Sequence, residues 1–181
     1  MTNTDRCEKA FAHHVGTIVQ NTEEFFIADY QDKEGNIEYY VNYVMDKRRG
    51  MLMITGDLGT CVMSLDNPMT PDRLNNLIHN NAEYFIGKIQ CSTDMFVDDF
   101  NEVVEAIQMH INCSSADAEF IRYEVQRGWD RDLFVPTQEL LEIIHEHDST
   151  CDEWLTNCGR HIAPRVYMWL YGFNEVCKLI T

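Results

Sequence analysis

The chain has 181 residues, 45% of them hydrophobic, which is typical of a globular protein of one domain. Fourteen lysines and arginines against thirty aspartates and glutamates give a net charge of −16, which argues against nucleic acid or an anionic membrane as a direct ligand. No apolar run approaches the roughly 20 residues that span a bilayer, and the first residues lack a secretory pattern, so we expect a cytoplasmic protein.

The N-terminal half is expected to hold one helix followed by an antiparallel sheet. Residues 7–15 place apolar side chains at i, i+3, i+4, i+7 and i+8, which predicts a helix. Segments rich in aromatic and β-branched residues follow, separated by turn sequences such as QDKEGN and KRRG. We expect four strands of a meander, at about residues 23–30, 37–45, 51–55 and 60–65.

The C-terminal half is expected to be helical. Thr70 and Pro71 form an N-cap and first-turn pair, and one long helix, or two broken near Asn80 and Asn81, follows to Ile89. Further helices are predicted at 97–112, 115–127 and 138–148 and from Pro164 onward. A run of strands followed by about five helices packed on them indicates an α+β fold. We expect one compact domain over residues 1–181.

The segment TGDLGT (residues 55–60) resembles a phosphate-binding loop only superficially. A dinucleotide fingerprint needs a third glycine before a helix, and a P-loop needs a lysine. Here a strand-like run follows Gly59, and Asp57 would repel a phosphate. We interpret the segment as a tight turn between two strands.

Cysteines and histidines are scattered through the chain. The seven cysteines do not form the dense framework of a small disulfide-linked domain, so we expect free, mostly buried thiols. Cys151, Cys158 and His161, with His145 or His147, are candidate zinc ligands. Their spacing, Cys-x6-Cys-x2-His, matches no common zinc motif, and buried thiols and structural histidines remain the simpler interpretation. We expect no metal and no cofactor.

No group of residues indicates catalysis. Acidic residues are so numerous that close carboxylate pairs must occur, and no local pattern singles out a nucleophile with its base. We therefore expect a protein that is not an enzyme, with no catalytic residue and no small-molecule substrate.

The acidic residues are concentrated in the centre of the chain. Sixteen acids and three bases lie between Asp94 and Glu153, a net charge of −13. Two predicted helices carry carboxylates along one side, about 5–6 Å apart at the backbone. A solvated face is the simplest explanation of one such helix, but two favour a surface that binds a basic groove. The candidate residues are Asp98, Asp99, Glu102 and Glu105 on the first helix and Glu139, Glu142 and Glu146 on the second.

A family resemblance gives these carboxylates a candidate partner. The segments RRGMLMITGDLGTCVMSLDNP (48–68) and AEYFIGKIQC (82–91), in an acidic, cysteine-rich chain of this length, resemble proteins of phages and mobile elements in gut Firmicutes. Within that group the chain resembles a type II-A anti-CRISPR family that inhibits the Cas-nine RNA-guided nuclease. The quoted segments carry no motif with an assigned role, so the resemblance transfers no binding residue.

The resemblance implies an inhibitor that acts in the bacterial host cell. Cas-nine holds its guide–target heteroduplex in a positively charged channel, which an acidic protein can occupy in place of DNA. We therefore expect the guide-loaded nuclease as partner and no direct DNA binding, with Trp129 as a packing residue at the rim of the interface. A phage regulatory or structural protein with another basic partner, or a metal-dependent enzyme using residues 145–161, are the alternatives.

Overall fold

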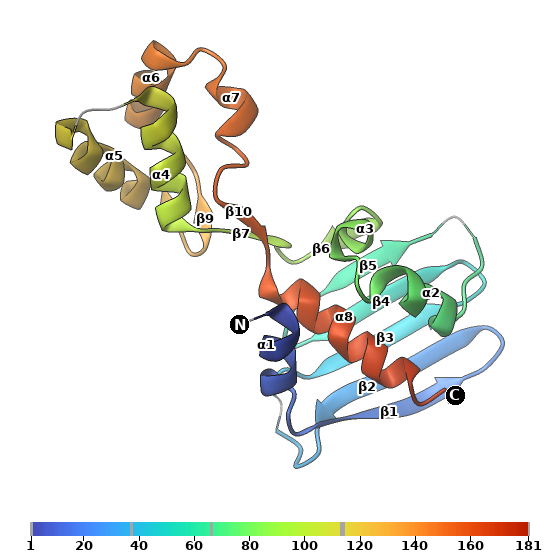
Figure 1. Cartoon of the computed structure of the whole chain (residues 1–181). Helices are drawn as coiled ribbons and strands as arrows, with labels where there is room; N and C mark the ends of the chain where they lie inside the picture. The colour runs from blue at the N-terminus through green and yellow to red at the C-terminus, as the bar shows by residue number, and fades with distance from the viewer. Residues whose placement is uncertain (1, 37, 66, 113–114, 181) are drawn as a thin grey trace. The chain divides into compact units, whose positions relative to one another are not determined.

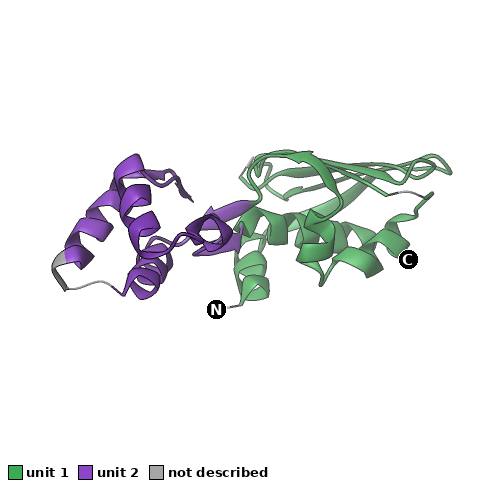
Figure 2. Cartoon of the chain, turned by 90° about the horizontal axis from the view of Figure 1, so that it is seen from above, with its two compact units in different colours: residues 1–95, 163–181 green, residues 96–162 purple. Residues whose placement is uncertain are grey.

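A computed structural model describes residues 2–36, 38–65, 67–112 and 115–180. The chain divides into two compact units (Figure 2), which we call the sheet unit, residues 1–95 and 163–181, and the helical unit, residues 96–162. The range expected to form one compact domain thus contains two compact units. The helical unit is an insertion in the sheet unit, because segments of the sheet unit precede and follow it. The two segments meet where the insertion begins and ends, since the backbone N–H of Ala163 donates to the carbonyl of Met95 (2.8 Å).

The sheet unit is built on a six-stranded antiparallel meander in the order β1-β2-β3-β4-β5-β6 (Figure 1). The α+β fold with its N-terminal helix is confirmed, but the sheet has two strands more than the four expected. The elements are α1 (Asn3–Ala10), β1 (His14–Asn21), β2 (Phe25–Asp32), β3 (Val41–Asp46), β4 (Met51–Gly56), β5 (Cys61–Ser64), α2 (Pro71–Ile78), α3 (Ala82–Ile86), β6 (Ile89–Ser92) and α8 (Pro164–Cys177).

The four helices of this unit lie over one face of the sheet, with α8 running across the strands (Figure 1). Strand β3 alternates buried and half-buried residues, as expected of a strand with one face packed on a core. Trp169 and Phe173 of α8 are fully buried, and the hydroxyl of Tyr43 on β3 donates to the carbonyl of Trp169 (2.8 Å). The C-terminal helix thus closes the core that the strands begin.

The TGDLGT segment is the turn that joins β4 to β5, as predicted. Gly56 and Gly59 have φ values of +138° and +97°, a backbone conformation that residues other than glycine rarely adopt. A carboxylate oxygen of Asp57 accepts the backbone N–H of Tyr39 (3.0 Å). The carboxylate is therefore occupied in holding the neighbouring turn.

The predicted starts of α2 and α6 are accurate, and both helices have a threonine N-cap. Thr70 caps α2 by accepting the N–H of Arg73, and the predicted break near Asn80 falls between α2 and α3. The N-terminal helix lies earlier in the chain than the expected 7–15, since it spans Asn3–Ala10 and residues 14 and 15 already belong to β1.

The helical unit has its own apolar core. Its elements are β7 (Phe96–Asp98), α4 (Phe100–Ile111), α5 (Ser115–Arg127), β8 (Trp129–Asp130), β9 (Leu133–Phe134), α6 (Gln138–His147), α7 (Cys151–Trp154) and β10 (Arg160–Ile162). Helices α4, α5 and α6 pack on one another through buried aliphatic side chains such as Ile107, Ile121 and Ile144. Three of the expected C-terminal helices, observed as α4, α5 and α6, therefore belong to this second unit, together with the short helix α7, which was not expected.

Candidate acidic interface

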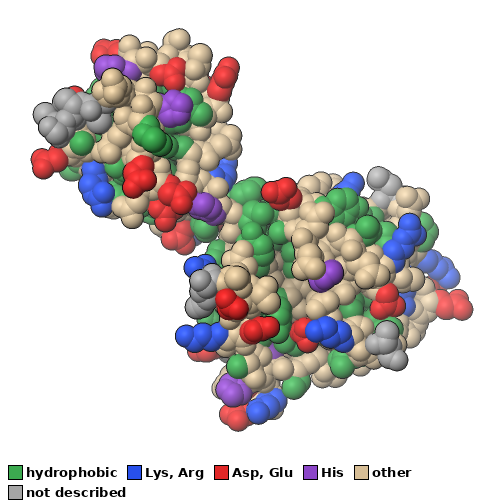
Figure 3. Space-filling view, in the orientation of Figure 1, with side chains coloured by type: hydrophobic (Ala, Val, Ile, Leu, Met, Phe, Trp, Pro, Cys, Tyr) green, Lys and Arg blue, Asp and Glu red, His purple; other side chains and the backbone are tan. Residues whose placement is uncertain are grey.

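Negative charge is concentrated in the helical unit. Its residues 96–162 include fifteen acids and four bases, a net charge of −11, whereas the longer sheet unit carries the remaining −5. Figure 3 shows acidic side chains spread over the visible face of this unit, with few basic ones between them. The geometry of the candidate carboxylates decides which of them are available to a partner.

Asp98 is not part of an exposed acidic helix face. It ends strand β7, two residues before α4 begins, and only 9% of its surface is exposed. One carboxylate oxygen accepts the backbone N–H of Phe134 (2.8 Å), and the other lies 3.4 Å from Nε of Arg160. The expected place of Asp98 on an exposed helix face is therefore wrong, because its carboxylate joins β7 to β9 and β10.

The other three carboxylates near α4 are exposed but differ in their contacts. Asp99 is the N-cap, and one of its oxygens accepts the N–H groups of Asn101 and Glu102. Oε2 of Glu102 lies 2.8 Å from Nε2 of His161, whereas Glu105 makes no ion pair among the described residues. Glu105 is therefore the carboxylate of this helix most available to a partner.

Helix α6 presents its three predicted carboxylates to solvent. Glu139 lies 3.9 Å from Nη1 of Arg127, and Glu142 accepts a hydrogen bond from the amide of Gln138 (3.0 Å). Glu146 is exposed and has no ion-pair partner within the described parts of the chain. Leu140 and Ile144 point into the core on the opposite side, so the expected acidic face of α6 is present.

Trp129 does not stand at an exposed rim. It is half-buried on the short β8–β9 hairpin, and its ring packs edge-on against Phe100 with centroids 5.3 Å apart. Phe134, on the other strand of the hairpin, lies close to it as well. The ring thus packs on the apolar core of the helical unit and is only partly accessible, and its predicted contact with a partner stays a prediction.

Two aromatic residues that the sequence analysis missed are exposed on α5. Phe120 and Tyr123 are 40% and 61% exposed, and the guanidinium of Arg127 lies over the Tyr123 ring, 5.9 Å from its centroid. The buried side of α5 carries Ile121, Glu124 and Val125, so both rings lie off the apolar stripe. Aromatic residues outside a core stripe were the signal that could have identified them.

A buried carboxylate fixes α5 to the start of α6. Glu124 is 2% exposed and accepts hydrogen bonds from the Thr137 hydroxyl (2.6 Å) and from Nη1 of Arg127 (2.8 Å). Thr137 is the N-cap of α6. The pKa of Glu124 is lowered mainly by the hydrogen bond from Thr137. The hydrogen bonds and the positive charge of Arg127 lower it further. This carboxylate is structural, and it positions the two helices that carry the exposed aromatic and acidic residues.

The predicted zinc-ligand set is not assembled. The Cys158 thiol donates to the carbonyl of Leu155 (3.1 Å) and His161 lies against Glu102. His145 does lie against Cys151, as one version of the predicted set requires, but the third side chain beside them is Asp152, which was not among the candidates. The described cysteines are free thiols, as expected, and all but the exposed Cys91 are buried or half-buried.

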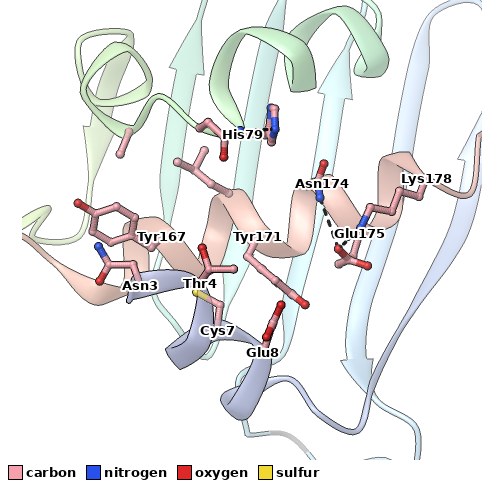
Figure 4. Close-up of a pocket in the computed structure, with 13 residues that line it drawn as sticks. Asn3, Thr4, Cys7, Glu8, His79, Tyr167, Tyr171, Asn174, Glu175 and Lys178 are labelled. Carbon is pink, nitrogen blue, oxygen red and sulfur yellow. Dashed lines mark hydrogen bonds and ion pairs between the residues drawn. The ribbon is translucent and has the colours of Figure 1, made fainter. Parts of the chain in front are cut away.

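A hollow of about 490 Å³ lies on the helical side of the sheet unit (Figure 4). Its lining comes from α1, α8 and the α2–α3 connection and includes Glu8, Tyr167 and Tyr171. Burial raises the pKa of the Cys7 thiol to about 11, so this thiol is protonated at neutral pH and is a poor nucleophile. The hollow offers hydrogen-bonding groups without an activated nucleophile among them.

Comparison with known proteins leaves the function to be argued from the chain itself. No family model, no curated protein and no solved structure matches it. No helix within the described residues is long and apolar enough to cross a membrane.

Proposed function

We propose that the chain is an anti-CRISPR protein that binds a guide-loaded Cas-nine nuclease through the helical unit and interferes with its binding of target DNA. The observation that carries the proposal is the net charge of −11 on 67 residues, with exposed carboxylates along α4 and α6. The resemblance of residues 48–68 and 82–91 to a type II-A anti-CRISPR family is the reason for proposing Cas-nine as the partner.

Charge complementarity supports a protein partner with a basic groove. Glu139, Glu142 and Glu146 follow one another at i, i+3 and i+7 on α6, a row whose spacing of about 5–6 Å at the backbone is comparable to that of phosphates. A channel that holds a nucleic-acid duplex is lined with cations. The unit then competes with DNA for the protein and does not bind DNA, which it repels.

The contacts in the structure rank the carboxylates of this surface. Glu105 and Glu146, which make no ion pair among the described residues, meet a partner's cations without losing an internal contact. Glu102 and Glu139 would give up their exposed ion pairs with His161 and Arg127 when they bind a partner. Such exposed pairs contribute little to the stability of the fold, about 0–1 kcal/mol. Asp99 contributes charge while it caps α4.

Apolar contacts supply the binding energy that exposed charges do not. Phe120 and Tyr123 lie one turn apart on α5, and aromatic residues are enriched at the energetic centres of protein interfaces. Exposed charges mainly raise the association rate and select the partner. Within the helical unit, the aromatic side chains thus supply binding energy, and the carboxylates raise the association rate and select the partner.

A mobility-shift titration tests the proposal. Guide-loaded Cas-nine and labelled target DNA are held fixed, and the purified chain is added at low and high salt. We expect the DNA-bound band to disappear, with a weaker effect at high salt because ions screen exposed charges. An intact band with blocked cleavage would place inhibition after DNA binding and contradict competition with DNA.

An intact band and normal cleavage with several nuclease orthologues would overturn the family assignment. The chain would then be a phage regulatory or structural protein whose acidic surface binds another basic partner. Capture of partners with the wild-type chain and with a chain carrying Glu105→Lys and Glu146→Lys would separate specific partners from background.

A further inference from the structure

We propose that His145, Cys151 and Asp152 form a binding site for one zinc ion in the helical unit, with a water molecule as the fourth ligand. The site uses none of the carboxylates or aromatic residues of the proposed interface, although His145 follows Glu142 and precedes Glu146 on α6. It also differs from the ligand set that the sequence suggests, since it uses Asp152 in place of Cys158 and His161.

The three side chains meet at the junction of α6 and α7. Sγ of Cys151 lies 3.5 Å from Nδ1 and 3.6 Å from Nε2 of His145. Oδ1 of Asp152 lies 4.0 Å from the same sulfur and 3.9 Å from Nε2 of His145. One sulfur, one nitrogen and one oxygen therefore form a triangle with all sides within 4.8 Å.

This triangle is close to the one that a tetrahedral zinc ion requires. Zinc bonds of about 2.3 Å to sulfur and about 2.1 Å to nitrogen and oxygen place the ligand atoms about 3.4–3.6 Å apart. The sulfur–nitrogen distance already agrees, and the two distances to Asp152 need to shorten by about 0.4–0.5 Å. Side-chain rotation is enough, because the side chain of Asp152 is 81% exposed.

The histidine ring must turn to coordinate the ion. The sulfur is almost equidistant from both ring nitrogens, so neither nitrogen yet points to the centre of the triangle. The side chain of His145 is 45% exposed, which leaves room for rotation about its Cβ–Cγ bond.

The backbone between the ligands is already held in place. Asp148 accepts hydrogen bonds from the backbone N–H and the hydroxyl of Thr150 and from the Trp154 indole (2.7–2.8 Å). These bonds fix the turn that carries the chain from α6 to Cys151. The loop therefore loses little conformational freedom when the ion binds.

The donor set selects the kind of metal. A thiolate and an imidazole favour zinc over magnesium and calcium, which prefer oxygen ligands. Cys151 is fully buried while His145 and Asp152 are exposed, so the solvent side is left for water. The burial of the sulfur also argues against a cysteine nucleophile, since a substrate cannot reach it.

Cobalt and zinc titrations test the site in the full-length chain without a histidine tag. Chelator-stripped, reduced protein receives Co²⁺, whose thiolate charge-transfer band and tetrahedral visible bands report coordination by cysteine. Zn²⁺ then displaces the cobalt, and the bound zinc is measured by mass spectrometry. The Cys91→Ser background removes the exposed thiol. We expect one ion per chain.

Four variants make the test specific. Asp152→Asn, on an exposed side chain, should lower zinc affinity at least about tenfold, and Cys151→Ser should abolish the thiolate band. Glu153→Gln, with the same charge change one residue away, and Cys158→Ser should leave affinity and spectrum unchanged. If Cys151→Ser does not fold, the Asp152→Asn and Glu153→Gln pair decides.

Two results would overturn the proposal. One is the absence of a thiolate band at stoichiometric Co²⁺. The other is equal zinc affinity in Asp152→Asn and Glu153→Gln. Neither result depends on the nuclease, so failure of the zinc site is distinguishable from failure of the proposed function.

Discussion

Nε2 of His161 lies 2.8 Å from Oε2 of Glu102, which joins strand β10 to helix α4 across 59 residues of sequence. From the sequence alone, the histidine is a candidate zinc ligand and the carboxylate a candidate partner contact. Both side chains are about half exposed. The pair explains why His161 is not available to Cys158 and why Glu105, one turn further along α4, is the better probe of the acidic surface.

Truncation of the exposed aromatic residues on α5 should weaken partner binding without unfolding the unit. Phe120→Ala and Tyr123→Ala truncate side chains that are 40% and 61% exposed, and each loss is expected to cost about 1–2 kcal/mol of binding. Isothermal titration with guide-loaded nuclease measures the change. Met109→Ala, at a 75% exposed residue of α4, is the control, and an equal loss there would contradict a specific role for α5.

Gly172→Ala should destabilise the sheet unit, although alanine is the better helix former by about 1 kcal/mol. A Cβ at this residue of α8 would lie 2.4 Å from the Tyr43 hydroxyl oxygen and 3.0 Å from Tyr30. Tyr43 is fully buried and cannot move away, so we expect a loss of about 1–3 kcal/mol. Urea unfolding followed by circular dichroism measures it.

The same clash can be tested by a double-mutant cycle. Tyr43→Phe removes the oxygen that the new methyl group would meet, so Gly172→Ala should cost less in that background than in the wild type. An additive cycle, or a Gly172→Ala chain more stable than the wild type, would show that close approach to Tyr43 does not explain the glycine.

Acid should weaken the helical unit through Glu124. Its folded-state pKa is lowered from 4.5 by the hydrogen bond of Thr137 and by Arg127, which also lies near Glu139. A lowered pKa gives stability that is present above the unfolded pKa and is lost as pH falls through the folded pKa. The stability advantage of the wild type over Glu124→Gln should therefore shrink below about pH 4.5.

Thermal unfolding of both chains at about pH 7 and about pH 3.5 measures this difference. Glu119→Gln on the exposed side of α5 removes one carboxylate without touching Thr137. If Glu119→Gln and Glu124→Gln show the same pH dependence, the Glu124 hydrogen bonds do not set it.

The fold was predictable where local chemistry marks the elements. The caps at Thr70 and Thr137 and the prolines at 71 and 164 mark helix starts directly. Strand β1 was missed because Cys7 and Phe11 are at helical spacing from His14 and Val15. The helix in fact ends at Ala10, and the strand begins at His14. Strand β6 was missed because Phe85 and Ile89 are at helical spacing across the C-cap Gly87.

The site was predictable only in part, because contacts between distant residues decide which carboxylates are exposed. Periodicity identified the acidic face of α6 correctly. It assigned Asp98 to the same kind of face, whereas its oxygens meet the Phe134 backbone and Arg160. Likewise nothing near Trp129 in the sequence shows that Phe100 would pack against it. The positions of both side chains depend on tertiary contacts that the spacing of residues within one helix does not contain.

The most direct test of the account is the salt dependence of binding between the chain and guide-loaded nuclease. Glu105→Lys combined with Glu146→Lys reverses two exposed carboxylates of the helical unit, and Glu23→Lys combined with Glu34→Lys makes the same change in the sheet unit. We predict that the first pair lowers the association constant at least about tenfold at low salt and reduces its salt slope. The second pair should have little effect. Equal affinities and equal salt slopes for the two pairs would contradict binding through the acidic surface of the helical unit.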